Sequence, residues 1–512
     1  MRIRGAAQVA VAALVLASCG GGGESVDVGG EGGSSSNGGG SGVLTAAISG
    51  EPDQLDPAAT SSYNSYQVLE NVYDTLVEPD ENLEMQPSLA ESWEISEDQL
   101  TWTFTLREGV TFHDGSPLTA DDVVYTYQRI IDEELNPSYR FATFKTIKAL
   151  DDTTVEIALT DPTPNLLANI GAYKGVGIVQ RKNVESGKIT DAPVGTGPFS
   201  LESFTAGQSI ELAANEDYWG GAPEIDGVTF TFVSDPTVAL QNLQSGEVQW
   251  TDNIPPQQVE TLSSGDDVTL ETAPSNDYWY LAANQNRPPF DDPKVRQALA
   301  YAIDREAITE AAKFGGATVN QTAIPESSEW YLDYAPYETD PEQAQQLLED
   351  AGVSDLSFEI MVTNEYPESV RAAQVIADQM DEIGVDVKIR TLDFATWLDE
   401  QGKGNFDVFV LSWLGNIDPD EFYYAQHHSD GGFNFQGYSN PEVDDLLDRA
   451  RTEVDQTACK ELYDQAATII VDEASYIYLY NPDVVQAWTP EVEGYTVRSD
   501  RAIRFRDVSL TG

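Results

Sequence analysis

The chain has 512 residues, with 87 Asp or Glu against 27 Lys or Arg, which gives a formal net charge of −60. This charge argues against binding to nucleic acid or to anionic lipid head groups, and it is typical of a surface adapted to a saline habitat. A surface that attracts cationic solutes is the alternative interpretation. Apolar residues make up 41% of the sequence, which is enough for the cores of two or more lobes.

The first residues have the layout of an export signal. Two arginines stand within Met1 to Arg4, and an apolar run follows from Ala6 to Ala17. That run is too short to span a membrane, so 1–18 is predicted to be a signal peptide. Leu16-Ala17-Ser18-Cys19 resembles the lipobox of bacterial lipoproteins, in which the signal is cleaved before the cysteine and the thiol carries a lipid. An ordinary signal peptide with a chance cysteine is the alternative.

A glycine- and serine-rich stretch follows Cys19 and continues to Gly42. Such a composition forms a flexible coil that does not pack. We therefore expect residues 19–42 to be a tether that holds a globular body outside the membrane. No apolar run after residue 19 approaches the roughly 20 residues of a spanning helix.

The next region combines short strands with a helix. Trp102, Phe104 and Leu106 alternate with polar residues, which predicts a strand, and Val155 to Leu159 repeats this pattern. Thr119-Ala120-Asp121-Asp122 has the signature of a helix start. We interpret 78–188 as a small inserted α+β domain.

Several later helices are predicted to begin at an Asp-Pro or Asn-Pro pair. The acid or amide caps free backbone N–H groups, and proline fits the first helical position. The pairs are Asp235-Pro236, Asp292-Pro293, Asp340-Pro341 and Asn440-Pro441.

Strands and helices alternate after residue 340. A helix from Pro341 to Gly352 precedes a strand at Phe358 to Val362, and a second helix ends at Gly384 before another strand. This alternation predicts α/β lobes with largely parallel strand pairing. Cys459 lies in a further predicted helix, where we expect a buried thiol; if Cys19 is lipidated, no disulfide partner exists.

Separated motifs along the chain add up to a family resemblance. The motifs are Leu55-Asp56-Pro57, Asn71-Val72-Tyr73-Asp74-Thr75-Leu76-Val77, Pro87-Ser88-Leu89-Ala90-Glu91-Ser92-Trp93, Trp102-Thr103-Phe104-Thr105-Leu106-Arg107, Phe112-His113-Asp114-Gly115, Pro193-Val194-Gly195-Thr196-Gly197-Pro198-Phe199, and the stretch from Pro289 to Leu299. In order and spacing they resemble the family 5 solute-binding proteins of ABC importers, the oligopeptide-, dipeptide- and nickel-binding group. The resemblance runs from about residue 44 to the C-terminus.

The resemblance implies an α/β, two-lobed periplasmic-binding-protein-like (Venus-flytrap) fold with a small α+β domain inserted in the first lobe. Lobe I would comprise 43–77, 189–275 and 476–512, the insert 78–188, and lobe II 276–475. A ligand would lie between the lobes, which close over it. The membrane permease and the ATPase subunits would be partners on other chains, and we expect a monomer.

The resemblance also points to ligand-binding segments. Ser61-Ser62-Tyr63-Asn64-Ser65 would bring Tyr63 and Asn64 to the ligand, although residues of this kind are also common in turns. Gly195-Thr196-Gly197 lacks the lysine of a P-loop, so we expect a turn that exposes its backbone near the crossing between the lobes.

Aromatic residues enter lobe II at Asn276-Asp277-Tyr278-Trp279-Tyr280. Core packing is the simpler interpretation of each ring, and Tyr278 or Tyr280 facing the ligand is the alternative. Trp413 is the residue that we most expect to touch the ligand.

The segment Ser412-Trp413-Leu414-Gly415-Asn416-Ile417-Asp418-Pro419-Asp420 departs from the family pattern. Peptide-binding relatives carry an aspartate where Asn416 stands, and that aspartate pairs with the α-ammonium of the peptide. A neutral amide cannot neutralise this charge. Either Asp418 or Asp420 takes over the role, or the ligand is neutral.

The sequence favours a binding protein over an enzyme and predicts no cofactor. It has neither the Gly-x-Ser-x-Gly elbow of serine hydrolases nor the His-Glu-x-x-His motif of zinc proteases. An extracytoplasmic hydrolase is therefore the least favoured interpretation. Only three histidines occur, among them adjacent His427 and His428, so no direct metal site is expected. The predicted function is a lipid-anchored, extracytoplasmic receptor of an ABC importer, for peptides first, and for a neutral oligosaccharide or a metal chelate as alternatives.

Overall fold

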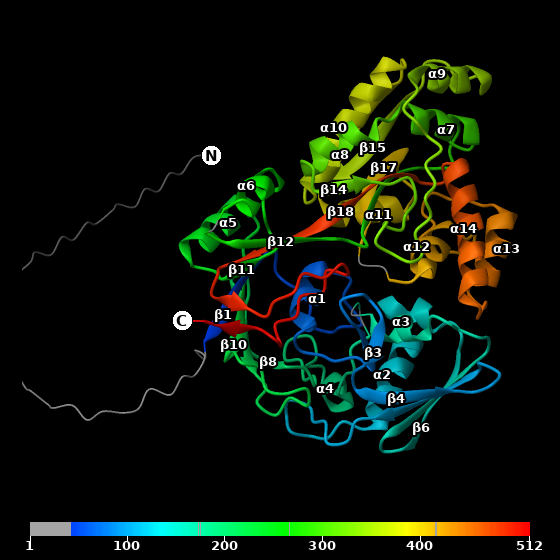
Figure 1. Cartoon of the computed structure of the whole chain (residues 1–512). Helices are drawn as coiled ribbons and strands as arrows, with labels where there is room; N and C mark the ends of the chain where they lie inside the picture. The colour runs from blue at the N-terminus through cyan, green and yellow to red at the C-terminus, as the bar shows by residue number, and fades with distance from the viewer. Residues whose placement is uncertain (1–41, 173, 175, 266, 415–416, 512) are drawn as a thin grey trace, which may run out of the picture. The chain divides into compact units, whose positions relative to one another are not determined.

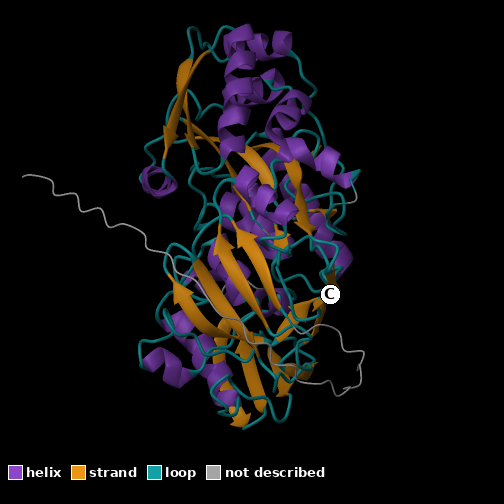
Figure 2. Cartoon of the chain, turned by 90° about the vertical axis from the view of Figure 1, so that its left-hand side faces the viewer, coloured by secondary structure: helices purple, strands orange, loops and turns teal. Residues whose placement is uncertain are grey.

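The computed structural model describes residues 42–172, 174, 176–265, 267–414 and 417–511. The predicted signal peptide, Cys19, most of the tether and Asn416 lie outside the described residues. Within the described part, residues 42–511 belong to one compact unit. No helix there is long and apolar enough to cross a membrane. Helices and strands lie side by side throughout this unit (Figure 2).

The largest sheet runs through both halves of the folded unit, in the order β16-β15-β17-β13-β18-β11-β1-β10-β9-β8, with β12 and β14 also paired to β18. Strand β15 pairs in parallel with β16 and β17, and β1 with β10 and β11. The other described pairs in this sheet are antiparallel. The prediction of largely parallel pairing is therefore wrong, because hairpins and long connecting strands contribute as much as strand–helix–strand units.

A first core lies beneath β1 and β8–β11 and includes aromatic residues of the C-terminal segment, such as Phe505. Its fully buried Trp250 packs edge-on against Phe505 at 5.4 Å. The elements of this part are β1 (Val43–Ile48), α1 (Tyr63–Leu69), β8 (Phe199–Thr205), β9 (Ser209–Ala214), β10 (Gly227–Phe232), α5 (Pro236–Ser245), β11 (Trp250–Thr251), the short 3-10 helix η2 (Pro256–Gln258), α6 (Val259–Ser263), β12 (Thr269–Pro274), β19 (Val492–Glu493) and β20 (Ser509–Leu510).

A separate insert core is formed by an antiparallel sheet, β4-β5-β7-β6, with α2 packed against it. The strand predicted at Trp102 to Leu106 is confirmed, and its apolar residues are the buried ones. The elements are β2 (Val77–Pro79), β3 (Met85–Pro87), β4 (Ala90–Ile95), β5 (Thr101–Leu106), α2 (Ala120–Asp132), the 3-10 helix η1 (Asn136–Phe141), β6 (Phe144–Asp151), β7 (Thr154–Leu159), α3 (Leu166–Gly171) and α4 (Arg181–Glu185).

A second core gathers buried residues from Tyr278 to Tyr480. Cys459 is buried in it, on α14, as predicted. The elements are β13 (Tyr278–Ala283), α7 (Pro293–Ala302), α8 (Arg305–Lys313), β14 (Ala317–Val319), α9 (Pro341–Asp350), β15 (Ser357–Thr363), α10 (Pro367–Glu382), β16 (Asp386–Leu392), α11 (Phe394–Gly402), β17 (Val408–Trp413), α12 (Pro419–His427), α13 (Pro441–Ala450), α14 (Gln456–Asp472) and β18 (Ile477–Trp488).

Strand β18 connects the first and second cores (Figure 1). Its beginning pairs with β13 and β14 of the second core, and its end pairs with β11 and β12 of the first. The chain crosses a second time between β12 and β13, at Ser275 to Asp277. Asn481 fastens the two crossings together, because its Nδ2 donates to the Asp277 carbonyl at 2.8 Å.

The predicted helix starts are confirmed. The carboxylates of Asp235, Asp292 and Asp340 and the amide oxygen of Asn440 each accept a backbone N–H from the first turn of their helix. At α2, the Asp122 carboxylate accepts the backbone N–H of Thr119 at 3.1 Å.

The turn at Gly195-Thr196-Gly197 is buried, so the expectation that it exposes its backbone is wrong. The backbone of Gly197 donates to the Val72 carbonyl at 3.0 Å. His113 of the insert holds both glycines, since its Nδ1 accepts from Gly195 and its Nε2 lies 3.0 Å from the Gly197 carbonyl oxygen. Burial lowers the pKa of His113, which keeps the imidazole neutral in this role.

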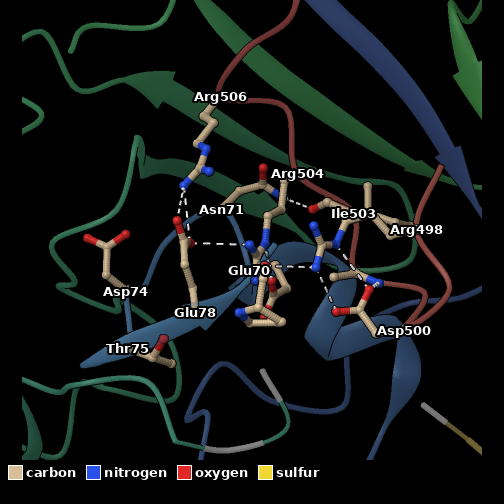
Figure 3. Close-up of polar contacts among 12 residues, drawn as sticks. Glu70, Asn71, Asp74, Thr75, Glu78, Arg498, Asp500, Ile503, Arg504 and Arg506 are labelled. Atoms are coloured by element: carbon tan, nitrogen blue, oxygen red, sulfur yellow. Dashed lines mark hydrogen bonds and ion pairs between the residues drawn. The ribbon is translucent and has the colours of Figure 1, made fainter. Parts of the chain in front are cut away.

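Arginines of the C-terminal segment fasten that segment to the beginning of the fold (Figure 3). Arg504 pairs with Glu70 at 2.9 Å and with Glu78 at 3.2 Å. Arg506 also pairs with Glu78, at 2.8 Å. Because Glu78 lies in β2, this network ties the first core to the start of the insert.

We predict that Gly195→Ala lowers the free energy of unfolding by about 1–3 kcal/mol, the usual cost of overpacking. A Cβ at this position would lie 2.0 Å from the Val72 carbonyl oxygen, so backbone must move. Urea unfolding gives the difference in free energy.

Gly402→Ala is the matched control, because a Cβ at Gly402 meets nothing within 4 Å. It should leave stability unchanged or raise it slightly, since Gly402 ends α11. Equal stability of the two variants would contradict this account of the turn.

Candidate functional site

Side chains from the insert and from the second core meet around the start of α12. Strand β17 ends at Trp413, and α12 begins with Asp418 as N-cap and Pro419 as its first residue. The Asp418 carboxylate accepts the Asp420 backbone N–H at 2.9 Å. Helix α12 therefore starts at the segment that the sequence singled out.

Asp418 also reaches across to the insert. Its carboxylate accepts a hydrogen bond from Asn165 Nδ2 at 3.0 Å, and Asn165 stands at the start of α3. Burial is the main cause that raises the pKa of Asp418 to about 7, and the charge of Asp420 adds to it. This carboxyl therefore gains or loses its proton near neutral pH.

Asp420 turns in another direction, into the second core. Arg451 Nε lies 3.1 Å from its carboxylate, and the Tyr463 hydroxyl donates to it at 3.4 Å. Burial raises the pKa of Asp420 to about 6 against the opposing charge of Arg451. The two acids that the sequence treated as interchangeable are thus engaged with different parts of the protein.

Glu421 is a contact that sequence reasoning missed. Its Oε1 lies 2.6 Å from Arg140 Nη2 of the insert, and the two side chains are 9% and 3% exposed. Its Oε2 accepts the Ile417 backbone N–H at 3.0 Å. Burial alone would raise the pKa of Glu421, but the charges of Arg140 and Lys174 hold it below its usual value. This enclosed ion pair joins the insert to α12.

Aromatic rings make a further contact between the same two parts. Trp413 is partly exposed, and its ring centroid lies 4.9 Å from that of Phe433. Phe433 in turn meets Tyr139 of the insert edge-on at 5.9 Å. Tyr139 remains 40% exposed, so Phe433 connects Trp413 to a partly exposed residue of the insert.

Tyr278 and Tyr280 lie within the second core, with exposed fractions of 1% and 0%. Tyr280 stacks on Tyr476 at 4.0 Å, and Tyr278 packs on Phe422 at 5.8 Å. In the sheet, Tyr278 is the register partner of Trp413. Both tyrosines therefore pack in the second core, as the simpler interpretation expected, on the strand paired with the one that carries Trp413.

Tyr63 and Asn64 lie at the start of α1, close to the crossing strands. The Tyr63 hydroxyl donates to Asp252 at 3.1 Å, and the Arg501 guanidinium lies 4.4 Å above its ring. Asn64 accepts a hydrogen bond from Ser49 at 3.1 Å. Burial raises the pKa of Asp252. No sequence motif marked Arg501 or Asp252.

A cavity of about 330 Å³ lies beside the crossing strands, among the described residues. Its lining includes Ser275, Asn320, Asn481 and Asp483. None of the predicted ligand-binding residues lines it. Trp413 and Asp418 lie where the second core meets the insert, whereas Tyr63 contacts Asp252 and Arg501 near the crossing strands. We take these two groups of contacts as the candidate site.

His427 is a buried part of the second core. His427 bonds through its two ring nitrogens to Ser475 and to Tyr478, both at 2.9 Å. Burial lowers its pKa to about 3. The described residues include no group of three or more His, Cys, Asp or Glu side chains able to hold a metal ion.

The chain matches the sequence profile of the bacterial extracellular solute-binding proteins, family 5 Middle, over residues 84–434. The dipeptide-binding protein of Escherichia coli strain K12 is 30% identical to it over 507 residues, which cover 91% of this chain and 94% of that protein. The chain belongs to family 5 of the bacterial extracellular solute-binding proteins.

Solved structures of this family superpose on the fold. DppA of Helicobacter pylori in complex with the peptide STSA has a TM-score of 0.84 and 28% identity, over 92% of this chain and 98% of that one. AppA of Bacillus subtilis in complex with a nonapeptide has a TM-score of 0.81 and 26% identity, over 92% and 99%. The resemblance and the two-lobed α/β fold inferred from the sequence are confirmed: this family 5 chain is an extracellular solute-binding protein and not an enzyme.

The raised pKa of Asp418 predicts a pH dependence. In the unfolded chain the carboxyl titrates near 4, so the folded state is favoured below about pH 4, and this advantage is lost as pH rises through about 7. Asp418→Asn stays neutral at all pH values. Its Tm relative to wild type should therefore rise by about 2 °C or more between pH 4 and 8, measured by circular dichroism at constant high salt.

Asp393→Asn is the control, since Asp393 also caps a helix but its pKa is lowered by hydrogen bonds from Thr396. The Asp393 carboxyl is already ionised in the folded state at pH 4, so the Tm of this variant relative to wild type should not rise between pH 4 and 8. Parallel pH profiles for the two variants would contradict the account of Asp418.

Proposed function

We propose that this protein is the receptor of an ABC importer for short peptides, and that it binds a peptide between its lobes and delivers it to a membrane permease. The observation that carries this proposal is full-length similarity to peptide binders. The E. coli dipeptide-binding protein is 30% identical over 91% of the chain, and the glutathione-binding protein GsiB of the same strain is 30% identical over 484 residues and 91% of the chain.

Lobe closure is the proposed capture step. The Arg140–Glu421 ion pair and the Asn165–Asp418 hydrogen bond both join the insert to α12. We propose that they belong to the closed arrangement of the lobes. A ligand that contacts both lobes adds contacts that exist only in the closed arrangement. It therefore increases the fraction of protein molecules that are closed. An ion pair this enclosed supports closure only while both partners are present, because either charge alone is costly to bury.

The proposed ligand contacts are Trp413 and Asp418 from the second lobe, and Tyr63 and Asn64 from the first. Trp413 supplies a partly exposed ring suited to stacking on apolar side chains. Asp418 is better placed than Asp420 to receive the ammonium group of a peptide, since Asp420 is engaged by Arg451.

Asn416 keeps its predicted role as the position where relatives carry the ammonium-binding aspartate. Tyr278 and Tyr280 are proposed to support the site from below, because their rings are buried. The three cores support the proposed division into lobe I (43–77, 189–275, 476–512), insert (78–188) and lobe II (276–475), except that residues 476–480 pack in the second core.

A lipid on Cys19 is the proposed membrane anchor. The signal peptide, residues 1–18, would be removed, and residues 19–42 would tether the folded body to the lipid. The lipobox-like sequence and the glycine-rich stretch support this part. The proposed location is the outer side of the bacterial cell membrane, the proposed state is a monomer, and the partners are a permease and its ATPase subunits.

A neutral oligosaccharide and a metal chelate remain the alternative ligands. NikZ of Campylobacter jejuni in complex with Ni(L-His) has a TM-score of 0.82 at 24% identity, a level that supports the shared fold alone. No described feature favours either alternative over a peptide.

Native mass spectrometry of the purified protein tests the ligand. After incubation in high salt with a tryptic digest of casein, we expect one or more peptides of a few residues to stay bound and to dissociate on denaturation. Retention of a sugar or a chelate from a cell extract, together with no peptide from the digest, would contradict the peptide assignment.

The denatured spectrum of protein taken from native membranes tests the anchor. The expected chain starts at Cys19 and exceeds its calculated mass by that of a diacylglyceryl group. An unlipidated chain that starts elsewhere would contradict the anchor while leaving the ligand assignment intact.

A further inference from the structure

The backbone at Arg501 has an unusual conformation. Its φ is +64°, a value that favours glycine or asparagine over residues with long side chains. Asp500, which is fully buried, holds this turn by accepting hydrogen bonds from Arg498 Nε and from the Ala502 backbone N–H, both at 3.1 Å. A non-glycine residue in this region costs free energy, so the surrounding contacts must hold it there.

The turn places Arg501 next to the crossing between the lobes. The Asn276 backbone N–H donates to the Ser499 carbonyl at 3.0 Å. Arg501 Nη1 lies 2.8 Å from a carboxylate oxygen of Asp277, a residue in the connection between β12 and β13. The guanidinium is therefore fixed against one of the two segments that join the lobes.

This guanidinium contacts a ring of the first lobe, and its charge acts on a group of the second lobe. It lies 4.4 Å above the ring of Tyr63 in the first lobe. Its charge also reaches Tyr366, at the start of α10 in the second lobe, where it opposes the rise in pKa caused by burial. The Arg501 side chain stays 28% exposed, so part of it remains accessible between these groups.

One donor of Arg501 is left without an acceptor. Its Nε is buried and meets no hydrogen-bond partner among the described residues, whereas Asp277 engages Nη1 on the other side of the fork. A buried donor without a partner is costly. The Nε edge of a guanidinium is suited to two parallel hydrogen bonds with a carboxylate.

We propose that Arg501 binds a carboxylate of the ligand, and in particular the C-terminal carboxylate of a short peptide. This inference rests on the proposed function. The stacked ring of Tyr63 and the ion pair with Asp277 hold the guanidinium in place before the ligand arrives, so little side-chain entropy is lost on binding.

Nearby acids make this site selective for ligands that carry a positive charge as well as a carboxylate. Asp252 lies close enough for its charge to act on Arg501, and Asp277 is already paired with it. A simple anion is therefore disfavoured. A peptide also brings an ammonium group, so its overall charge is compatible with the acidic surroundings of its carboxylate.

The test uses an equimolar mixture of di-, tri- and tetra-alanine, each as the free acid and as the C-terminal amide, read out by native mass spectrometry. Wild type should retain free acids in preference to amides. Arg501→Asn tolerates the positive φ and removes the charge, and we expect it to bind the free acids about 10- to 100-fold more weakly, the range of a charge-assisted hydrogen bond. Its affinity for the amides should change by less than about threefold. Arg501→Lys should lie between the two, since an ammonium lacks the planar fork.

Arg506→Gln is the matched control. It removes a charge from the same segment, and Arg506 is 32% exposed and pairs with Glu78 instead of with the crossing. This variant should bind like wild type, and Tm measurements should find both variants folded.

Wild type that retains acids and amides equally, or Arg501→Asn that keeps the wild-type preference for acids, would overturn this inference while the peptide function stands. Wild type that retains no alanine peptide of either kind would overturn the inference together with the proposed function.

Discussion

The two crossings between the lobes are the constraint on which the rest of this structure depends. Strand β18 is hydrogen-bonded to strands of both large cores, so neither core can move away from the other. Relative motion has to be taken up where the pairing partners change, near Asp483 in β18 and from Ser275 to Asp277 in the other crossing. Asn481, itself held by the Asn320 side chain at 2.8 Å, joins these two short segments. These two short segments are therefore where we expect any turning of one lobe against the other to occur.

Positive charge is scarce in this chain, and three arginines lie where separate parts meet. Arg140 joins the insert to α12, Arg501 joins the C-terminal turn to the crossing, and Arg504 joins that segment to β2. In a protein with a net charge of −60, each such arginine also reduces repulsion between acidic parts. The buried pairs are screened little by salt, whereas the exposed acids are screened strongly. High salt should therefore relieve the repulsion while preserving these contacts.

Local patterns were predictable from the sequence and distant contacts were not. The caps at Asp340 and Asn440 depend on a few neighbouring residues, so residue type and spacing were enough to predict them. The different directions of Asp418 and Asp420 follow from helix geometry, because residues two apart on a helix point to different sides, yet their partners could not be predicted. Pairs such as Arg140–Glu421 join residues 281 positions apart, and only the packing of whole lobes brings them together. The antiparallel partners of β18 were missed for the same reason.

If the lobes close around a ligand, the distance between the insert and the second lobe should shorten on binding. Measuring that distance tests lobe closure most directly. Leu150 on β6 and Val454 after α13 are 54% and 56% exposed, so spin labels on Leu150→Cys and Val454→Cys can be attached in a protein with Cys19→Ser. Cys459 should not compete, since it is buried and its pKa is raised to about 12. Pulsed electron paramagnetic resonance should find a broad distance distribution in the free protein and a narrower, shorter one when peptides from the casein digest are bound. An unchanged distribution in a sample that demonstrably retains peptide would contradict closure as the mechanism of capture.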